Sequence, residues 1–108
     1  MSVATGVLTD KSNIINNYSL SQNYPNPFNP STRINYNLPS DFWVTLDIYN
    51  ITGERISQLV NEEKSAGYYS VVFGSSKLSS GVYFYKITAV NKTTGNNFSS
   101  IKKMILLK

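Results

Sequence analysis

Hydrophobic and polar residues alternate with a period of two along most of this chain, and no segment shows the period of a helix. This alternation predicts β-strands, because successive side chains of a strand point to opposite faces of a sheet. It predicts strands over residues 32–38, 42–50, 54–60, 68–73, 82–90 and 98–107, with turns at 39–41, 51–53 and 91–97. Residues 61–66 are predicted to form a charged loop, and residues 74–81 a serine-rich connection.

The phase of each strand indicates which side chains face the core. In residues 54–60, Ile56 and Leu59 are out of phase, which a β-bulge or an early strand end explains. Gly53 and Gly81 stand where the chain turns sharply. Short strands separated by frequent turns predict an all-β, immunoglobulin-like antiparallel β-sandwich of about seven strands. The predicted core residues are Ile34, Tyr36, Leu38, Val44, Leu46, Ile48, Tyr69, Val71, Phe73, Tyr83, Tyr85, Ile87 and Ala89.

A stiff segment precedes the first of these strands. Each of its prolines fixes φ and biases the residue before it towards extended geometry. We expect its two asparagines to bond their own backbone as Asx turns. We expect its two aromatic rings to pack against the domain, or alternatively to contact a partner. The segment consists of Tyr24, Pro25, Asn26, Pro27, Phe28, Asn29 and Pro30.

Composition narrows the chemistry of this 108-residue chain, whose length fits one domain. The sequence has no cysteine, which removes thiol catalysis and disulfides, and no histidine, the usual general base near neutral pH. The adjacent Glu62 and Glu63 would point to opposite sides of a strand and cannot share a ligand. We therefore predict no catalytic residue, no cofactor, no metal site and no small-molecule substrate: the domain is not an enzyme.

The formal net charge is +4, but its lysines are scattered instead of forming the basic stripe of a nucleic-acid interface. No apolar run is long enough to span a membrane, and no secretory signal is visible at the start.

The last predicted strand is apolar on both faces towards its end, although a half-buried strand normally has one polar face. Either a loop covers the outer face, or the apolar surplus and an accessible strand edge are available to a partner. The candidate residues for partner recognition are Lys102, Lys103, Met104, Ile105, Leu106, Leu107 and Lys108.

Four segments in this order, residues 20–32, 46–53, 78–85 and 102–108, resemble the type A C-terminal sorting domain of the bacterial type IX secretion system. The resemblance runs from Leu20 to Lys108. It implies that residues 1–22 are a linker to an N-terminal cargo domain and that residues 23–108 are the sorting domain, monomeric, in a Bacteroidetes-type bacterium. The implied partners are the type IX translocon and a sortase-like protease. The implied location is the cell surface or the medium, reached through the periplasm and outer membrane. A secretory signal would precede the linker in a longer precursor.

Two other classes remain open. The proline segment and residues 81–85 also resemble the immunoglobulin-like domain of flagellar hook-capping proteins, although residues 73–81 are shorter than the corresponding insert. A carbohydrate-binding sandwich would need an exposed aromatic platform, which Trp43, Tyr49 and Phe84 could supply.

Overall fold

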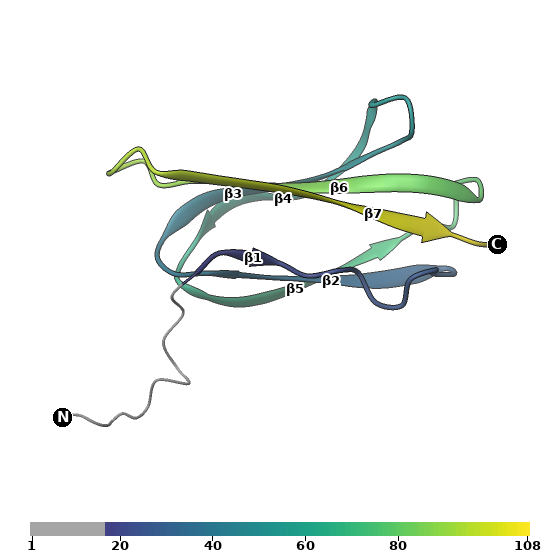
Figure 1. Cartoon of the computed structure of the whole chain (residues 1–108), viewed down its shortest axis with the longest axis horizontal. Coiled ribbons are helices and arrows are strands. Elements are labelled where there is room, and N and C mark those ends of the chain that lie inside the picture. Colours follow the sequence, from purple (N-terminus) through teal and green to yellow (C-terminus); the bar gives the residue numbers. More distant parts are fainter. Residues whose placement is uncertain (1–16) are drawn as a thin grey trace, which may run out of the picture.

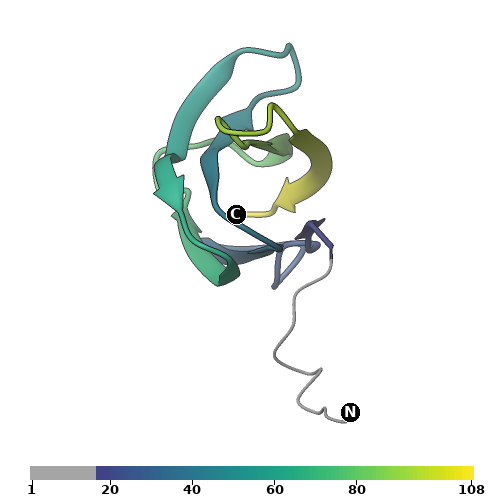
Figure 2. The ribbon, with the colours of Figure 1, turned by 90° about the vertical axis from the view of Figure 1, so that its left-hand side faces the viewer.

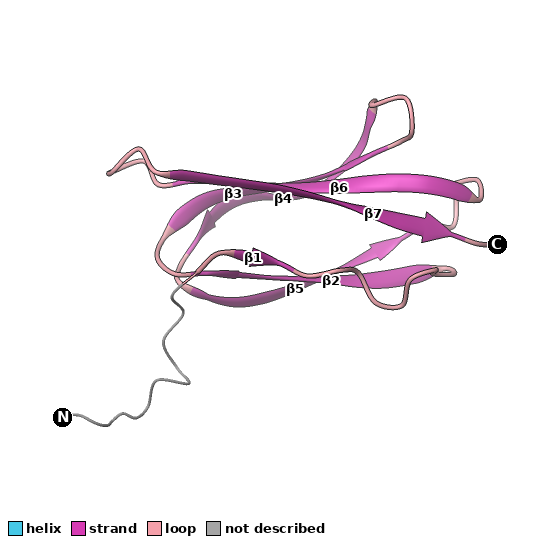
Figure 3. Cartoon of the chain, viewed as in Figure 1, coloured by secondary structure: helices cyan, strands magenta, loops and turns pink. Residues whose placement is uncertain are grey.

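A computed structural model describes residues 17–108, and these residues form an antiparallel β-sandwich without a helix (Figures 1 and 3). One sheet has the strand order β1-β2-β5 and the other has the order β4-β3-β6-β7. The predicted all-β sandwich of seven strands is confirmed. The described residues contain no helix that could cross a membrane. The strands are β1 (Ser19–Leu20), β2 (Ser31–Leu38), β3 (Phe42–Tyr49), β4 (Arg55–Lys64), β5 (Gly67–Gly74), β6 (Gly81–Val90) and β7 (Asn97–Leu106).

The core lies between the facing sheets, which Figure 2 shows end-on, and it follows the predicted alternation. The core positions of β2, β3 and β6 are all buried, whereas Tyr69 and Val71 of β5 are partly buried against the cluster. Phe42, Leu20 and Phe28 add to this core from a strand start, a short strand and a loop. Val60 of β4 and Met104 and Leu106 of β7 complete it. Because buried positions recur at every second residue, a shift of register by one would expose the whole set.

Two β-bulges account for the out-of-phase residues of β4. The register between β3 and β4 shifts between Leu46 and Asp47 and again between Ile48 and Tyr49. Leu46 faces Val60 and Asp47 faces Gln58, so Leu59 is the extra residue of the first bulge. The second bulge similarly passes over Ile56, which lies between the partners of Ile48 and Tyr49. Of the two explanations offered by the sequence, the bulge is therefore correct.

One predicted loop is wrong. Residues 61–64 continue β4 and pair with residues 42–45 of β3, so only Ser65 and Ala66 separate β4 from β5. Their charged side chains sit on an edge strand where they reach water, and pairing with β3 overrides their low strand propensity.

The described structure begins before the predicted domain boundary. Ser19 and Leu20, within the range predicted as linker, pair with Asn37 and Tyr36 of β2. The seventh strand therefore comes from β1, just before the proline segment. Residues 1–16 of the predicted linker lie outside the described residues.

The turn between β3 and β4 is held by one asparagine. The side-chain oxygen of Asn50 accepts hydrogen bonds from the backbone amides of Thr52 and Glu54. Gly53 adopts a φ of 89°, a left-handed conformation that side-chain-bearing residues rarely take, as its position in the sequence predicted.

Candidate recognition site at the tail

The candidate site is the tail, defined here as residues 102–108. Its first five residues end β7, which pairs with β6 from Asn97 to Leu106 and forms one edge of the larger sheet. Even-numbered residues of this strand face the core and odd-numbered residues face outwards. The tail therefore alternates between core packing and surface along its length.

The proline segment runs beside the tail and occupies its free edge. Phe28 forms a parallel bridge with Leu106: its amide donates to the carbonyl of Ile105 at 2.9 Å, and its carbonyl accepts from the amide of Leu107 at 3.1 Å. The side-chain oxygen of Asn26 accepts from the amide of Ile105 at 2.9 Å, and Gln22 donates to the carbonyl of Lys103 at 2.7 Å. The backbone of residues 103–107 is thus paired on both sides.

A buried polar network fixes the base of the proline segment. Asn23, almost fully buried, donates from its side chain to the hydroxyl of Thr32 at 2.9 Å and to the carbonyl of Pro25 at 3.1 Å. The Thr32 hydroxyl donates to the same carbonyl at 2.8 Å. Tyr24 and Arg33 exchange two backbone hydrogen bonds. These bonds hold the segment against β2, and buried polar groups need such partners to avoid a desolvation cost.

The serine-rich connection between β5 and β6 holds the end of the tail. Ser80 accepts a hydrogen bond from the amide of Lys108, and the carbonyl of Ser76 accepts one from its side-chain amine. Ser75 is buried and donates to the carbonyl of Pro30 from both its amide and its hydroxyl. We call the two groups of residues that contact the tail, 22–30 and 75–80, the tail clamp.

Two core tyrosines of β6 bond to the clamp and to the residue just before it. The hydroxyl of Tyr83 donates to the carbonyl of Ser79 at 2.7 Å, and that of Tyr85 donates to the carbonyl of Ser21 at 2.6 Å. Both rings lie in the core with their hydroxyls at its margin, as the sequence predicted. Burial raises the pKa of Tyr85 to about 12, so this hydroxyl keeps its proton above pH 10, where an exposed tyrosine loses it. Gly81 begins β6 next to the clamp.

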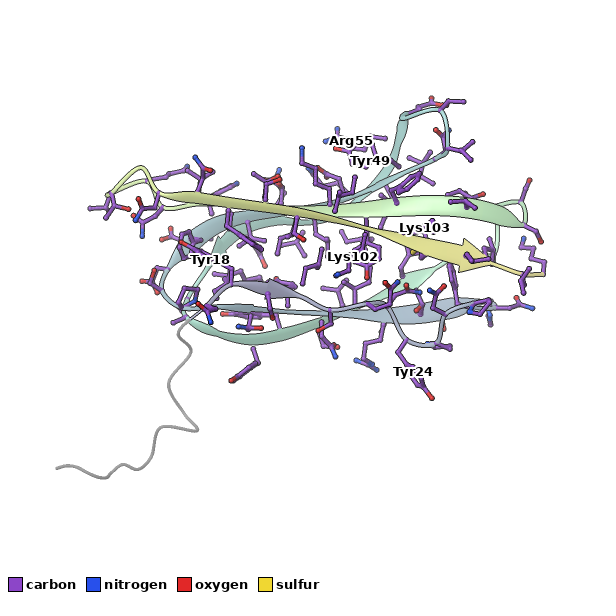
Figure 4. All side chains as sticks on the ribbon, in the orientation of Figure 1. Tyr18, Tyr24, Tyr49, Arg55, Lys102 and Lys103 are labelled. Carbon is purple, nitrogen blue, oxygen red and sulfur yellow. The ribbon has the colours of Figure 1, made fainter. Side chains whose placement is uncertain are left out.

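The seven predicted recognition residues differ in how exposed they are. Met104 and Leu106 are fully buried, so a partner could contact them only if the sandwich opened. Lys103, Leu107 and Lys108 are exposed, Ile105 is half-buried on the outer face, and Lys102 reaches into the gap between the sheets (Figure 4).

Two expectations about the proline segment also need correction. Phe28 is the predicted anchor, with 1% of its surface exposed and its ring 6.1 Å from that of Phe73. Tyr24 is not an anchor: its ring is 80% exposed and points away from the sandwich (Figure 4), because the backbone pairing with Arg33 turns it outwards. The hydrogen bond of Asn26 goes to Ile105, 79 positions away, instead of to its own backbone.

The predicted accessible edge at the end of the tail is likewise occupied, by the proline segment. The surface of the tail that a partner can contact consists of the exposed Leu107, the half-buried Ile105, and Lys103 and Lys108. Within residues 17–108, neither Lys103 nor Lys108 forms an ion pair with a carboxylate. No local pattern indicated that Gln22 and Ser75 take part in the clamp, because their contacts depend on how distant segments are packed.

The three aromatic residues of the possible carbohydrate platform do lie on the outer face of the larger sheet. Tyr49 is directly opposite Phe84. Trp43 is already engaged: its indole N–H donates to Asn61 at 3.0 Å, and the amine of Lys92 lies 4.2 Å from the centre of its ring. All three side chains are partly buried, so they form no open platform.

Comparison with known proteins gives one family and one fold. The chain is similar to part of dimeric latent PorU from Porphyromonas gingivalis, with a TM-score of 0.63 and 21% identity. The similarity covers 86% of this chain and 10% of that one, so this chain spans about a tenth of its length, and it supports the fold alone. No curated protein matches. The model of the secretion system C-terminal sorting domain family matches residues 22–106 and includes both parts of the clamp and β7. This chain belongs to the secretion system C-terminal sorting domain family.

Proposed function

We propose that the export machinery binds the outward-facing side chains of the clamped tail while the domain is folded. As a member of its family, the domain is a C-terminal sorting signal for type IX secretion, recognised by the type IX machinery and directing export to the cell surface or the medium. The hook-capping and carbohydrate-binding alternatives are not favoured. We further propose that the machinery contacts the side chains of Lys103, Leu107 and Lys108, with Ile105 between them.

One observation supports this proposal above the others: two separate segments of the chain hydrogen-bond to the tail. Gln22 and the proline segment bond residues 103, 105 and 107, and the serine-rich connection bonds Lys108. An exposed terminal strand without such contacts frays. The clamp keeps Leu107 and the two lysines in fixed positions, and pre-ordering of this kind lowers the entropic cost of binding.

The remaining partners belong to the same proposal. A cargo domain precedes residue 17, and a sortase-like protease cuts the chain before Tyr24 to release the cargo or transfer it to a lipid anchor. The pairing of Tyr24 with Arg33 and the network around Asn23 support this position, because cutting within residues 24–30 would require the clamp to open first. Mass spectrometry of the released cargo would contradict it by finding a new end beyond Pro30.

Without histidine or cysteine, the domain acts by binding and has no catalytic role of its own. This part of the proposal would be refuted if the purified domain showed a hydrolytic activity that a still-exported mutant had lost.

Export of a reporter fused to the chain tests the surface directly. The triple variant K103Q, L107S and K108Q removes two cations and one exposed aliphatic side chain without touching the buried Met104 and Leu106. We expect it to melt within a few degrees of the wild type and to stay in the periplasm of a type IX-competent host.

The matched control makes the same chemical changes elsewhere. The variant I51S, K86Q and K92Q also removes one exposed aliphatic side chain and two cations, from the β3–β4 turn, β6 and the β6–β7 turn. It should be exported normally. Normal export of both variants would show that the export machinery does not recognise the tail surface.

A further inference from the structure

The sandwich has four strand edges, and three of them are protected against pairing with another chain. β1 has only two residues. β4 contains Arg55, Glu62, Glu63 and Lys64 and is distorted by its two bulges. The end of β7 is covered by the proline segment, and Lys102 points inwards from the same strand. Short edges, charges, bulges and covering loops are the usual means by which proteins prevent edge-to-edge association.

Among the residues that the structure describes, 17–108, none of these protections is found at the edge of β5. Its eight residues, from Gly67 to Gly74, include no charged side chain, no proline and no register shift with β2. Figure 2 shows this strand at the edge of the smaller sheet that lies away from β1. Lys64 lies near one end, with its amine 5.2 Å from the centre of the Tyr69 ring, but it precedes the strand and leaves the middle free.

The pairing of β2 shows which backbone groups of β5 are unpaired. Arg33 and Asn35 bond towards Tyr24 and Ser21, on the β1 side, so the alternate residues Thr32, Ile34 and Tyr36 bond towards β5. Their partners are Phe73, Val71 and Tyr69. Because a strand alternates, the amides and carbonyls of Tyr68, Ser70 and Val72 point outwards, and within residues 17–108 they have no hydrogen-bond partner.

The chemistry of this edge defines what can bind it. Donors and acceptors that repeat at every second residue are matched by the backbone of another extended polypeptide. On the inner side, Tyr69 and Val71 are only half-buried, so the inward residues of an added strand would extend the core and should be apolar. On the outer side, Tyr68 and Val72 are 70% and 54% exposed and favour uncharged neighbours.

We propose that β5 binds an extended, uncharged segment of the export machinery, with apolar residues at alternate positions, by β-strand addition. The proposal rests on the proposed function, and it gives the domain a second contact on the opposite edge of the sandwich from the tail. Because this binding uses backbone hydrogen bonds, it requires no particular side-chain sequence in the added strand. A second copy of this chain is a less favourable occupant than a neutral segment, because each copy carries a formal charge of +4.

Two variants block the edge without disturbing the pairing with β2. Val72→Glu places a charge on the open edge, at the position directly opposite Arg33 of β2. Ser70→Pro removes an amide that points outwards, a position where edge strands tolerate proline. Asn35→Glu is the matched control, because it adds the same charge directly opposite Ser70 but on the central strand β2.

The first readout is export of a reporter fused to the chain. We expect Val72→Glu and Ser70→Pro to lower export at least tenfold, with melting temperatures near that of the wild type, and Asn35→Glu to be exported normally. Normal export of both edge variants overturns this inference and leaves the tail proposal intact. Failure of the wild-type fusion to be exported instead overturns the proposed function.

The second readout is amide hydrogen exchange of the folded domain with and without the purified type IX translocon. Binding at β5 should slow the exchange of the Tyr68, Ser70 and Val72 amides at least tenfold and leave Ser99 and Ile101 on β7 unchanged. Protection confined to β7 overturns the inference. Protection that appears in the domain alone as its concentration rises, and that Val72→Glu abolishes, overturns the choice of occupant in favour of a second copy.

Discussion

Replacing Phe28 with alanine tests whether the proline segment is held by its single buried ring. The side chain is 1% exposed, packs edge-on against Phe73 and lies where the backbone bonds to Ile105 and Leu107. Deleting a fully buried phenylalanine side chain costs about 3–5 kcal/mol, because transfer free energy is lost and a cavity is left. Small domains are stable by only about 5–15 kcal/mol in total, so this is a large fraction.

The measurement is thermal and urea denaturation, with Tyr24→Ala as the matched control from the same segment. At roughly 4–8 °C per kcal/mol for a domain of this size, Phe28→Ala should lower the melting temperature by about 12 °C or more. Tyr24→Ala removes a ring that is 80% exposed and should change it by less than about 3 °C, since such surface changes stay within roughly 0.5 kcal/mol.

Hydrogen exchange adds a local readout. The amides of Ile105 and Leu107, which bond to Asn26 and Phe28, should exchange faster in Phe28→Ala even at temperatures where the domain is folded. Equal destabilisation by the two alanine variants, or unchanged exchange at both amides, would refute the assignment of Phe28 as the anchor of the clamp.

Three further predictions follow from the hydrogen bonds and buried tyrosines. Tyr36→Phe removes a buried hydroxyl that has no hydrogen-bond partner within residues 17–108, and it should leave the free energy of unfolding unchanged or higher. Tyr85→Phe loses the bond to Ser21 and should cost about 1 kcal/mol, so a cost for the first variant alone would contradict the assignment. Burial raises the pKa of both tyrosines from 10 to about 12, so as the pH rises they lose their protons in the unfolded chain before they do so in the folded domain. The free energy of unfolding should therefore stay constant below pH 10 and fall between pH 10 and 12. Urea titrations of the wild type and the double phenylalanine variant should show the steeper fall in the wild type; equal slopes would exclude the shifts. Asn26→Ala leaves the Ile105 amide without its side-chain partner and should cost about 1 kcal/mol, while the exposed Asn29→Ala should cost nothing measurable in the same melts.

Much of the fold was predictable because its determinants are local. The alternation in β2, β3 and β6 gives their faces, and the phase error at Ile56 and Leu59 reveals the two bulges of β4. The clamp was not predictable in this way. The bond between Asn26 and Ile105 joins residues 79 positions apart, and the bridge from Phe28 to Leu106 depends on where the two sheets place the chain. The strand at residues 61–64 was missed for the same reason, since its partner β3 determines its conformation.

Several of the apolar residues that carry the family resemblance are buried and shape the domain instead of meeting a partner. Phe28, Tyr83, Tyr85, Met104 and Leu106 are all in the core. A partner can therefore read only the exposed residues between them, and these have fixed positions only when the domain is folded. It follows that a synthetic peptide of residues 102–108 should compete poorly with the folded domain for the purified type IX translocon.

The expected difference can be estimated from the cost of ordering the peptide. Fixing the backbone costs about 1–2 kcal/mol for each residue, and the clamp has already met this cost for residues 103–107. Even if only a third of it appears in binding, about 2–3 kcal/mol, the peptide should bind roughly 30- to 150-fold more weakly than the domain. A scrambled peptide of the same composition provides the baseline, and the measurement is displacement of the labelled domain. Equal competition by the peptide and the domain would mean that the tail is read as a free chain, and the clamp would then contribute stability without contributing to recognition.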